Sequence, residues 1–211
     1  NKPWMLYCHY GDLHDPYDRS NPTTGYFRWT GNEKPSYLAA FEYLDTQLAA
    51  LHNSLQDQSL LKDTVIVIAT DHGEEFPEEH GYQYHSINLF DTSVKTPLIV
   101  HFPGQTKKET ITKLTSSIDL APTLLKRLTG NSPVDVYPYP ENRVVFFSSM
   151  YNDVQGLAQD GWKYTRFPKR NSEELYHTKE DVWERKNVVN RPEHKEKIHR
   201  YRDWLAQYRH L

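Results

Sequence analysis

An aspartate and a histidine, Asp71 and His72, directly follow an apolar run over residues 64–69. The run is rich in β-branched residues and is long enough for a strand buried on both faces. Gly73 comes next and permits a sharp turn. Ligand sites in open α/β sheets lie beyond the carboxyl ends of strands. A carboxylate and an imidazole at this position could therefore be two ligands of a metal site. A strand that ends in a solvated loop is the alternative that this short motif leaves open.

Further histidines and carboxylates occupy loops that we expect at the same edge of the sheet. A predicted strand over residues 4–9 is followed by a polar loop that contains three carboxylates and one histidine. A second polar loop follows residues 64–69 and also carries histidines. Their gathering at one edge favours an anion or metal site over isolated structural histidines. The candidates are His14, Asp71, His72, His80 and His85, with Asp12, Asp15, Glu74 and Lys95 as secondary candidates.

Some of the remaining side chains are set aside. Lys95 begins a predicted strand and is expected at the far edge of the sheet, so it is not included in the proposed site. The other histidines lie in a strand or in the polar C-terminal region, where we expect structural or solvated roles: His101, His177, His194, His199 and His210.

Motifs for other chemistries are absent from the sequence. It has no Gly-x-Ser-x-Gly elbow, no phosphate-binding glycine-rich loop and no Cys-x-x-Cys. No residue is an obvious activated nucleophile. Asp71 and His72 alone are too few ligands for a metal ion, which needs at least one or two further carboxylates.

The elements that position the candidates begin with a strand, a helix and a strand. Ser36 is a plausible N-cap of a helix that ends near Gln58. Apolar residues recur along it at spacings of four and three and form one stripe: Tyr37, Phe41, Leu44, Leu48, Leu51 and Leu55. A right-handed βαβ unit would place the polar ends of both strands at one edge, which brings His14 towards Asp71 and His72.

The sequence pattern predicts that the chain is divided into two structural regions. Residues 1–132 form the α/β part, which also contains a strand near residues 97–102 and a helix from Ser117 to Gly130. After a proline-rich linker, residues 133–211 form a small antiparallel subdomain that closes with a helix from about Pro192. Its strands are expected at residues 144–147, 156–158, 162–167 and 174–176, with an Asp-Gly hairpin turn at residues 160–161.

Composition excludes several classes of protein. The 211 residues carry 25 Lys and Arg against 28 Asp and Glu, and the resulting net charge of −3 suggests no nucleic-acid partner. No apolar run is long enough for a membrane span. The single cysteine, Cys8, cannot form an intrachain disulfide and is expected to be a small buried apolar residue.

Several segments, taken in order, resemble the C-terminal part of the sulfatase family within the alkaline phosphatase superfamily. The resemblance covers nearly the whole chain and rests on the order and spacing of residues 6–17, 67–76, 80–85, 95–100, 119–125 and 174–187. It implies an α/β fold with part of a doubly wound, mostly parallel sheet, together with the small antiparallel subdomain and terminal helix.

The resemblance also implies roles for individual residues. Asp71 and His72 would be metal ligands, and His14 and His85 would contact the sulfate or phosphate group, polarising it or protonating the leaving oxygen. His80 lies in the matching loop without a family role. The metal would be Ca²⁺ in a sulfatase, and Zn²⁺ or Mn²⁺ in a phosphoryl-transfer relative.

The family's nucleophile motif, Cys/Ser-x-Pro-x-Arg, and the acidic metal ligands that precede it do not occur in the sequence. We therefore expect a fragment of a metal-dependent sulfatase-like hydrolase of sulfate esters, inactive alone, whose partner is the N-terminal half of the same protein. The alternatives are a phosphoryl or phosphoethanolamine transferase or phosphodiesterase of the same superfamily, and a non-catalytic anion-binding domain. A sulfated or phosphorylated substrate and a periplasmic or extracellular location, with a possible N-terminal membrane anchor, are implied by the resemblance.

Overall fold

The computed structural model describes residues 3–14, 17, 34–85, 87–130, 142–149 and 153–208. It contains two compact units, Asn1–Val67 with Val100–Thr106, and Ile68–Ile99 with Lys107–Leu211. The boundary predicted between residues 132 and 133 falls outside the described residues and stays a prediction.

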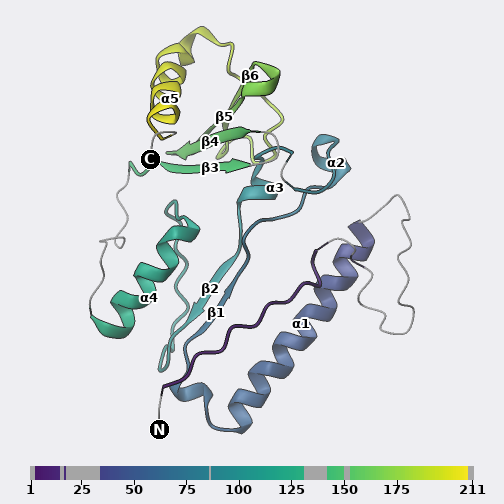
Figure 1. Cartoon of the computed structure of the whole chain (residues 1–211), viewed down its shortest axis with the longest axis vertical. Helices are drawn as coiled ribbons and strands as arrows, with labels where there is room; N and C mark the ends of the chain where they lie inside the picture. Colours follow the sequence, from purple (N-terminus) through teal and green to yellow (C-terminus); the bar gives the residue numbers. More distant parts are fainter. Residues whose placement is uncertain are drawn as a thin grey trace. The chain divides into compact units, whose positions relative to one another are not determined.

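The first unit contains the predicted long helix, α1, which spans Lys34–Asp57 (Figure 1). A short 3-10 helix, η2 (Leu61–Asp63), links it to the next strand. Only Ala40 is fully buried in α1. Most residues of the predicted stripe are partly buried, namely Tyr37, Leu44, Leu48, Leu51 and Leu55, and Phe41 is exposed. The periodicity therefore predicted the helix correctly.

The predicted strand over residues 4–9 does not form. The segment is extended, but within the described residues no strand pairs with it, and its apolar side chains are exposed, with Met5 at 89% and Tyr7 at 79%. Cys8 is exposed as well, so its predicted burial is wrong. Pairing of such a segment requires a neighbouring strand, and burial of its side chains requires elements that cover the faces of the sheet; a local sequence pattern supplies neither. The βαβ unit that depended on this strand is therefore absent from the described structure.

Two predicted strands do pair. β1 (Ile66–Ala69) and β2 (Leu98–His101) form a two-stranded sheet. Between them the chain makes two one-turn helices, α2 (Pro77–His80) and α3 (Asp91–Val94). β2 was predicted to be buried, yet Ile99 is 59% exposed and Leu98 is exposed too. Pairing with β1 bonds the backbone of β2 but does not cover the faces of the sheet, from which these side chains project.

The second unit contains the predicted antiparallel subdomain. Four strands lie in the order β3-β4-β5-β6, and each neighbouring pair is antiparallel. Their bounds are Val145–Ser149, Val154–Gln159, Trp162–Phe167 and Ser172–His177. Asp160 and Gly161 join β4 to β5 with φ angles of 50° and 79°, the left-handed conformation that a tight hairpin turn requires.

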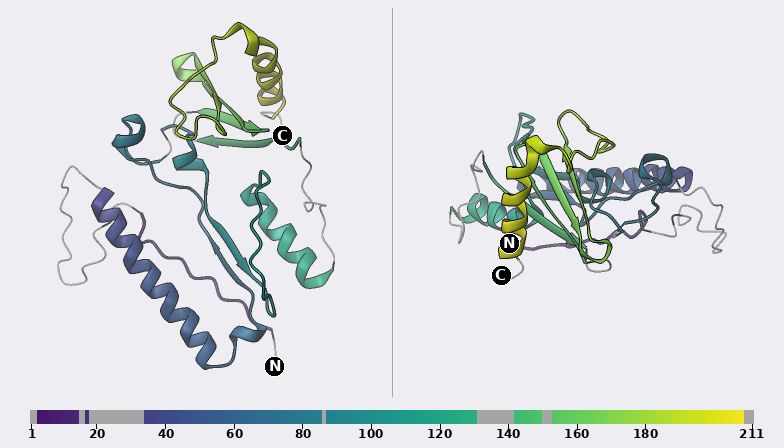
Figure 2. Two further views of the ribbon diagram at one scale, coloured as in Figure 1. Left: turned by 180° about the vertical axis from the view of Figure 1, so that it is seen from behind. Right: turned by 90° about the horizontal axis from the view of Figure 1, so that it is seen from above.

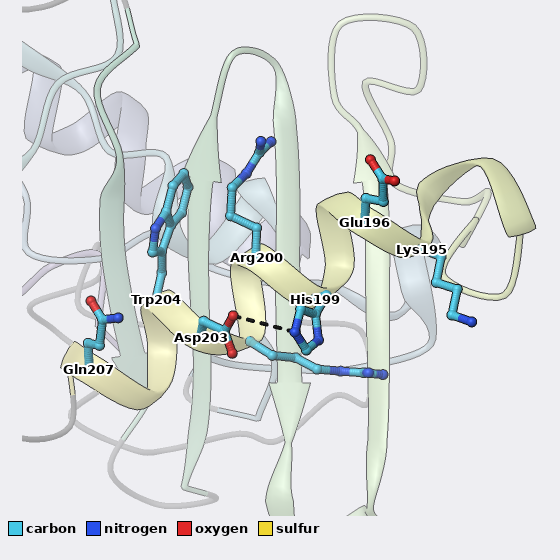
Figure 3. Close-up of a pocket in the computed structure, with 8 residues that line it drawn as sticks. Lys195, Glu196, His199, Arg200, Asp203, Trp204 and Gln207 are labelled. Carbon is cyan, nitrogen blue, oxygen red and sulfur yellow. Dashed lines mark ion pairs between the residues drawn. The ribbon is translucent and has the colours of Figure 1, made fainter.

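The terminal helix, α5 (Lys195–Tyr208), lies across one face of this sheet (Figures 2 and 3). Its apolar stripe and the inward side chains of the sheet form one core: Leu157, Tyr164, Leu175, Ile198, Tyr201 and Leu205. A further helix, α4 (Leu120–Thr129), ends at Gly130 in the left-handed conformation, as the sequence predicted.

Candidate metal and anion site

Asp71 and His72 lie in the loop that follows β1, and their own backbone orients them. The His72 N–H donates to Asp71 Oδ1 at 3.0 Å, and His72 Nδ1 lies 2.9 Å from the Gly73 carbonyl oxygen. An Nδ1–H that donates to a backbone carbonyl leaves the lone pair on Nε2, which is the usual arrangement of a metal-binding histidine. The Asp71 side chain is 89% exposed, so its carboxylate is accessible.

The two donors fit a divalent cation as neighbouring ligands. Asp71 Oδ1 and His72 Nε2 lie 3.8 Å apart. Two donors that each bind one ion at about 2.4 Å are roughly 3.4–3.9 Å apart when the angle at the ion is about 90–110°. Within the residues that the structure describes, no group of three or more His, Cys, Asp or Glu is placed to hold a metal. The pair thus offers two ligands of a site that needs more.

His85 lies beside this pair. Its imidazole ring stacks on that of His72, with the ring centroids 3.8 Å apart and the planes 25° from parallel. His85 Nδ1 is 3.3 Å from Glu74 Oε1, and the Glu74 side chain is buried. The structure therefore brings together three residues predicted for the site, with Glu74 behind His85.

Gly73 allows the site loop to approach α3. The Gly73 N–H donates to the Ser93 carbonyl oxygen at 2.8 Å. A Cβ at Gly73 would lie 2.0 Å from the Thr92 carbonyl oxygen, so no other residue fits without movement of the backbone. From the sequence, Gly73 was expected to permit a sharp turn. The structure shows that its close packing against α3 is the stronger reason for a glycine at this position.

Glu75 and His80 anchor the same loop through buried contacts. Glu75 is fully buried; its Oε1 is 2.6 Å from His80 Nδ1, and its Oε2 accepts a hydrogen bond from the Thr92 hydroxyl. His80 Nε2 is 2.7 Å from the Trp183 carbonyl oxygen. Both ring nitrogens of His80 therefore face acceptors, and a doubly protonated ring satisfies both. His80, a candidate from sequence, has a structural role here.

A buried ion cluster, absent from the sequence prediction, connects α3 to the antiparallel subdomain. Lys163 Nζ on β5 lies 2.5 Å from Asp91 Oδ1 and 2.6 Å from Glu184 Oε1, and it donates to the Leu89 carbonyl oxygen at 3.0 Å. Glu184 Oε2 accepts from the Asp91 N–H at 2.5 Å. Burial raises the pKa of the Glu184 carboxyl, and Lys163 opposes that shift. Lys163 thereby holds the N-terminus of α3, the helix on which Gly73 packs.

The other candidates are less fully placed. His14 belongs to the first unit, where its backbone N–H donates to the Gly11 carbonyl oxygen at 3.2 Å. Its predicted proximity to Asp71 therefore stays a prediction, and Asp15 lies outside the described residues. Lys95 follows two residues after Ser93, which bonds to Gly73, so it lies at the same end of the strand pair as the site loop. The far-edge position predicted for Lys95 is wrong. The chain leaves β1 at its C-terminal end and, after α3, starts β2 from that same end of the strand pair.

Two pockets of the described part of the chain lie on α5 and on the neighbouring antiparallel subdomain. One is an open depression along α5, lined by Lys195, Glu196, His199, Arg200, Arg202, Asp203, Trp204 and Gln207 (Figure 3). It includes none of the predicted site residues. In the site loop, the Asp71 carboxylate is the exposed group, whereas the His85 side chain is 25% exposed.

Comparison with known proteins identifies the family. A family model described as "Sulfatase" matches residues 1–130. The chain belongs to the sulfatase family. In keeping with this, a delta 4,5-hexuronate-2-O-sulfatase of Bacteroides thetaiotaomicron is 26% identical over 211 residues, covering 85% of this chain and 42% of that protein. A choline-sulfatase of Rhizobium meliloti is 27% identical over 176 residues, covering 74% of this chain and 33% of that protein.

Solved structures confirm the fold class. A protein in complex with its substrate D-glucosamine-2-N,6-O-disulfate aligns with a TM-score of 0.69 at 21% identity, over 82% of this chain and 39% of that one. A putative sulfatase from Bacteroides thetaiotaomicron aligns with a TM-score of 0.66 at 26% identity, over 84% and 44%. The predicted sulfatase-type α/β fold, with its antiparallel subdomain and terminal helix, is confirmed. The chain spans less than half the length of these relatives.

Among the helices in the described part of the chain, none is long and apolar enough to cross a membrane.

Proposed function

We propose that this chain supplies the C-terminal part of a metal-dependent sulfatase-like hydrolase of sulfate esters. Asp71 and His72 would bind the divalent metal, and His85 would contact the sulfate group. The observation that carries the proposal is the arrangement of these residues: Asp71 Oδ1 lies 3.8 Å from His72 Nε2, and the His85 ring stacks on His72. His14 is proposed as a second contact to the sulfate on the ground of the family resemblance alone.

The protein groups have separable tasks in this proposal. The Gly73 carbonyl fixes the ring of His72, so that Nε2 is directed as a ligand. Glu74 Oε1 lies 3.3 Å from Nδ1 of His85 and orients its ring, and in this proposal His85 would donate a proton to the leaving oxygen or contact a sulfate oxygen. When bound, the metal would neutralise the charge of the anion and lower the pKa of an oxygen nucleophile. Ca²⁺ is the metal that we propose for sulfate-ester hydrolysis.

We further propose that the nucleophile and the remaining acidic ligands come from an N-terminal part of the same protein. The greater length of the relatives supports this, as does the exposure of apolar side chains such as Trp4, Met5 and Leu6. An extended apolar segment without a paired strand offers an edge on which further strands of a sheet can add. The division at residues 132–133 is retained as part of this proposal.

The substrate class is proposed from the relatives. Their names specify sulfated hexuronate and choline sulfate, so we propose a sulfate ester of a small polar molecule. The phosphoryl-transfer alternative has no observation here that favours it. A periplasmic or extracellular location, with or without an anchor in another part of the protein, is also proposed from the resemblance.

Metal binding tests the proposal directly. The imidazole proton signals of this chain, assigned by single His substitutions, are followed by NMR during titration with Mn²⁺, a paramagnetic probe. Signals of His72 and His85 should broaden first, and Asp71→Asn or His72→Ala should weaken that effect about tenfold or more. His199→Ala, which alters an exposed histidine on α5, is the control.

Two results would contradict the proposal. Equal broadening of all histidines in the native chain and in both site variants would exclude a specific site. Turnover of an aryl sulfate by the isolated chain at rates typical of an enzyme would contradict the proposal that its nucleophile is supplied from elsewhere.

A further inference from the structure

A second, separate cleft lies on the antiparallel subdomain. It has a volume of about 470 Å³ and forms where the end of the β5–β6 hairpin meets the segment before α5. It shares no residue with the site around Asp71. Its lining combines arginines, amides, a hydroxyl and apolar groups: Arg166, Phe167, Pro168, Asn171, Ser172, Glu173, Asn187, Val189, Asn190 and Arg202.

Glu173 in this cleft is bonded to Arg202 and lies beside a second guanidinium group, that of Arg166. Arg202 donates to Glu173 from Nε at 2.8 Å and from Nη2 at 2.5 Å, and the Tyr164 hydroxyl donates to the same carboxylate at 2.7 Å. These bonds keep Glu173 ionised, and Arg202 lowers the pKa of this carboxyl. Arg166 lies opposite Glu173 in the β5–β6 register. Two positive charges therefore meet one negative charge, and a single positive charge remains.

Arg166 carries that remaining charge without a bonded partner. It interacts with Glu173 through its charge, but it forms no hydrogen bond or ion pair with any residue in the described part of the chain. Arg202 donates two of its five N–H groups to Glu173, and its side chain is 50% exposed, so further N–H groups can reach a ligand. Unused N–H donors of arginine on the wall of a cleft suit a planar or tetrahedral oxyanion.

The rest of the lining suits a polar molecule that carries such an anion. Asn171 and Asn190 offer amide groups and Ser172 offers a hydroxyl, while Pro168 and Val189 are apolar. The Asn187 amide, by contrast, is occupied: its Oδ1 accepts from the N–H groups of Leu175 and Val189, each at 3.0 Å. Asn187 therefore shapes the cleft, whereas Arg166 and the remaining N–H groups of Arg202 can bind a ligand.

We propose that this cleft binds the oxyanion group of a small anion that carries hydroxyl groups, with Arg166 as the principal contact and Arg202 as the second. The shared chemistry is a sulfate or carboxylate group of charge about −1 beside hydroxyl groups. This binding site is additional to the metal site, and it stands or falls independently of the proposed hydrolase function.

The test is a titration of this chain followed by NMR of the Arg Nε–H and Asn side-chain signals. Glucose 6-sulfate and glucuronate are the two anionic probes, glucose is the neutral probe, and the ionic strength is held constant with NaCl. We expect saturable shifts of Arg166 and Asn171 with one or both anions and none with glucose. The anion with the lower Kd identifies the source of the oxyanion.

Two variants make the test specific. Arg166→Gln should raise the Kd about tenfold or more, because it removes a charge-assisted hydrogen bond. Arg200→Gln, which removes an arginine from α5 that does not line this cleft, should leave the Kd unchanged. The proposal is overturned if the anions cause no saturable shift, if glucose shifts the same signals equally, or if the two variants weaken binding to the same extent.

Discussion

Lys163 Nζ lies 2.6 Å from Glu184 Oε1, and both side chains are at most 2% exposed. The two residues are distant in the sequence, and Asp91, from a third segment, completes the cluster at 2.5 Å from Lys163. The cluster ties the N-terminus of α3 to the antiparallel subdomain. Three expected outcomes depend on this contact and on others near the candidate site, and a fourth depends on Glu173 in the second cleft.

Replacing Lys163 with methionine should destabilise the chain by about 3–5 kcal/mol, because it leaves buried carboxylates without their counter-ion. The measurement is urea unfolding followed by circular dichroism. Lys186→Met changes an exposed lysine close to Glu184 and should alter the free energy of unfolding by no more than about 0.5 kcal/mol. Equal effects of the two variants would show that the cluster contributes nothing.

Glu75 and His80 should be energetically coupled. Their side chains are 2.6 Å apart and almost fully buried, so each single substitution, Glu75→Gln or His80→Gln, loses the same contact. A double-mutant cycle measured by urea unfolding should give a coupling energy of roughly 0.5–3 kcal/mol. A coupling near zero would mean that the loop is held by the Thr92 contact and not by His80.

Gly73→Ala should displace the site loop from α3. The added Cβ meets the Thr92 carbonyl oxygen, and overpacking of this kind costs about 1–3 kcal/mol. The NMR signals of the His72 and His85 rings should move.

Gly104→Ala is the control for that change. It also costs about 1–2 kcal/mol, because Gly104 has a φ of 74°, yet its Cβ meets nothing within 4 Å. The histidine signals should be unaffected. If both alanine variants shift those signals alike, the close approach at Gly73 does not determine the geometry of the site.

Glu173 should make the free energy of unfolding of the subdomain depend on pH. Arg202 holds the pKa of this carboxyl below its ordinary value of 4.5 in the folded chain. The stabilisation is therefore present above that value and is lost as the pH falls through the lower, folded-state pKa. Urea midpoints measured from about pH 7 to pH 3 should fall less steeply for Glu173→Gln than for the native chain. Glu196→Gln, on the exposed side of α5, should follow the native curve.

Elements with a local signature were predictable from the sequence. The apolar stripe of α1 and the Asp160-Gly161 turn both depend on residues close in sequence, and both are found where predicted. Residues 4–9 have an equally clear strand pattern, yet they form no strand, because a strand depends on neighbours that periodicity does not specify.

The candidate site was predictable to a similar extent. Asp71, His72 and His85 were named from sequence, and the structure places them together. Lys163 was not predicted from the sequence. A lysine in a strand is normally expected to point towards solvent, and the partners of Lys163 lie far away in the sequence. His80 was a candidate because it lies in the same polar loop as His85. Its contacts with Glu75 and Trp183 show that it supports the loop, and the sequence alone could not distinguish this role from a chemical one.

The ion cluster of Lys163 also limits how sulfatase subdomains can be recombined. Asp91 lies before the proline-rich linker, while Lys163 and Glu184 lie after it. A chimera that joins this C-terminal region to the corresponding part of another relative would keep the Lys163–Glu184 pair, but it would lose the second carboxylate of the cluster if its new partner lacked an acid at the position of Asp91. Grafts of this region should therefore be designed with all three residues transferred as one unit.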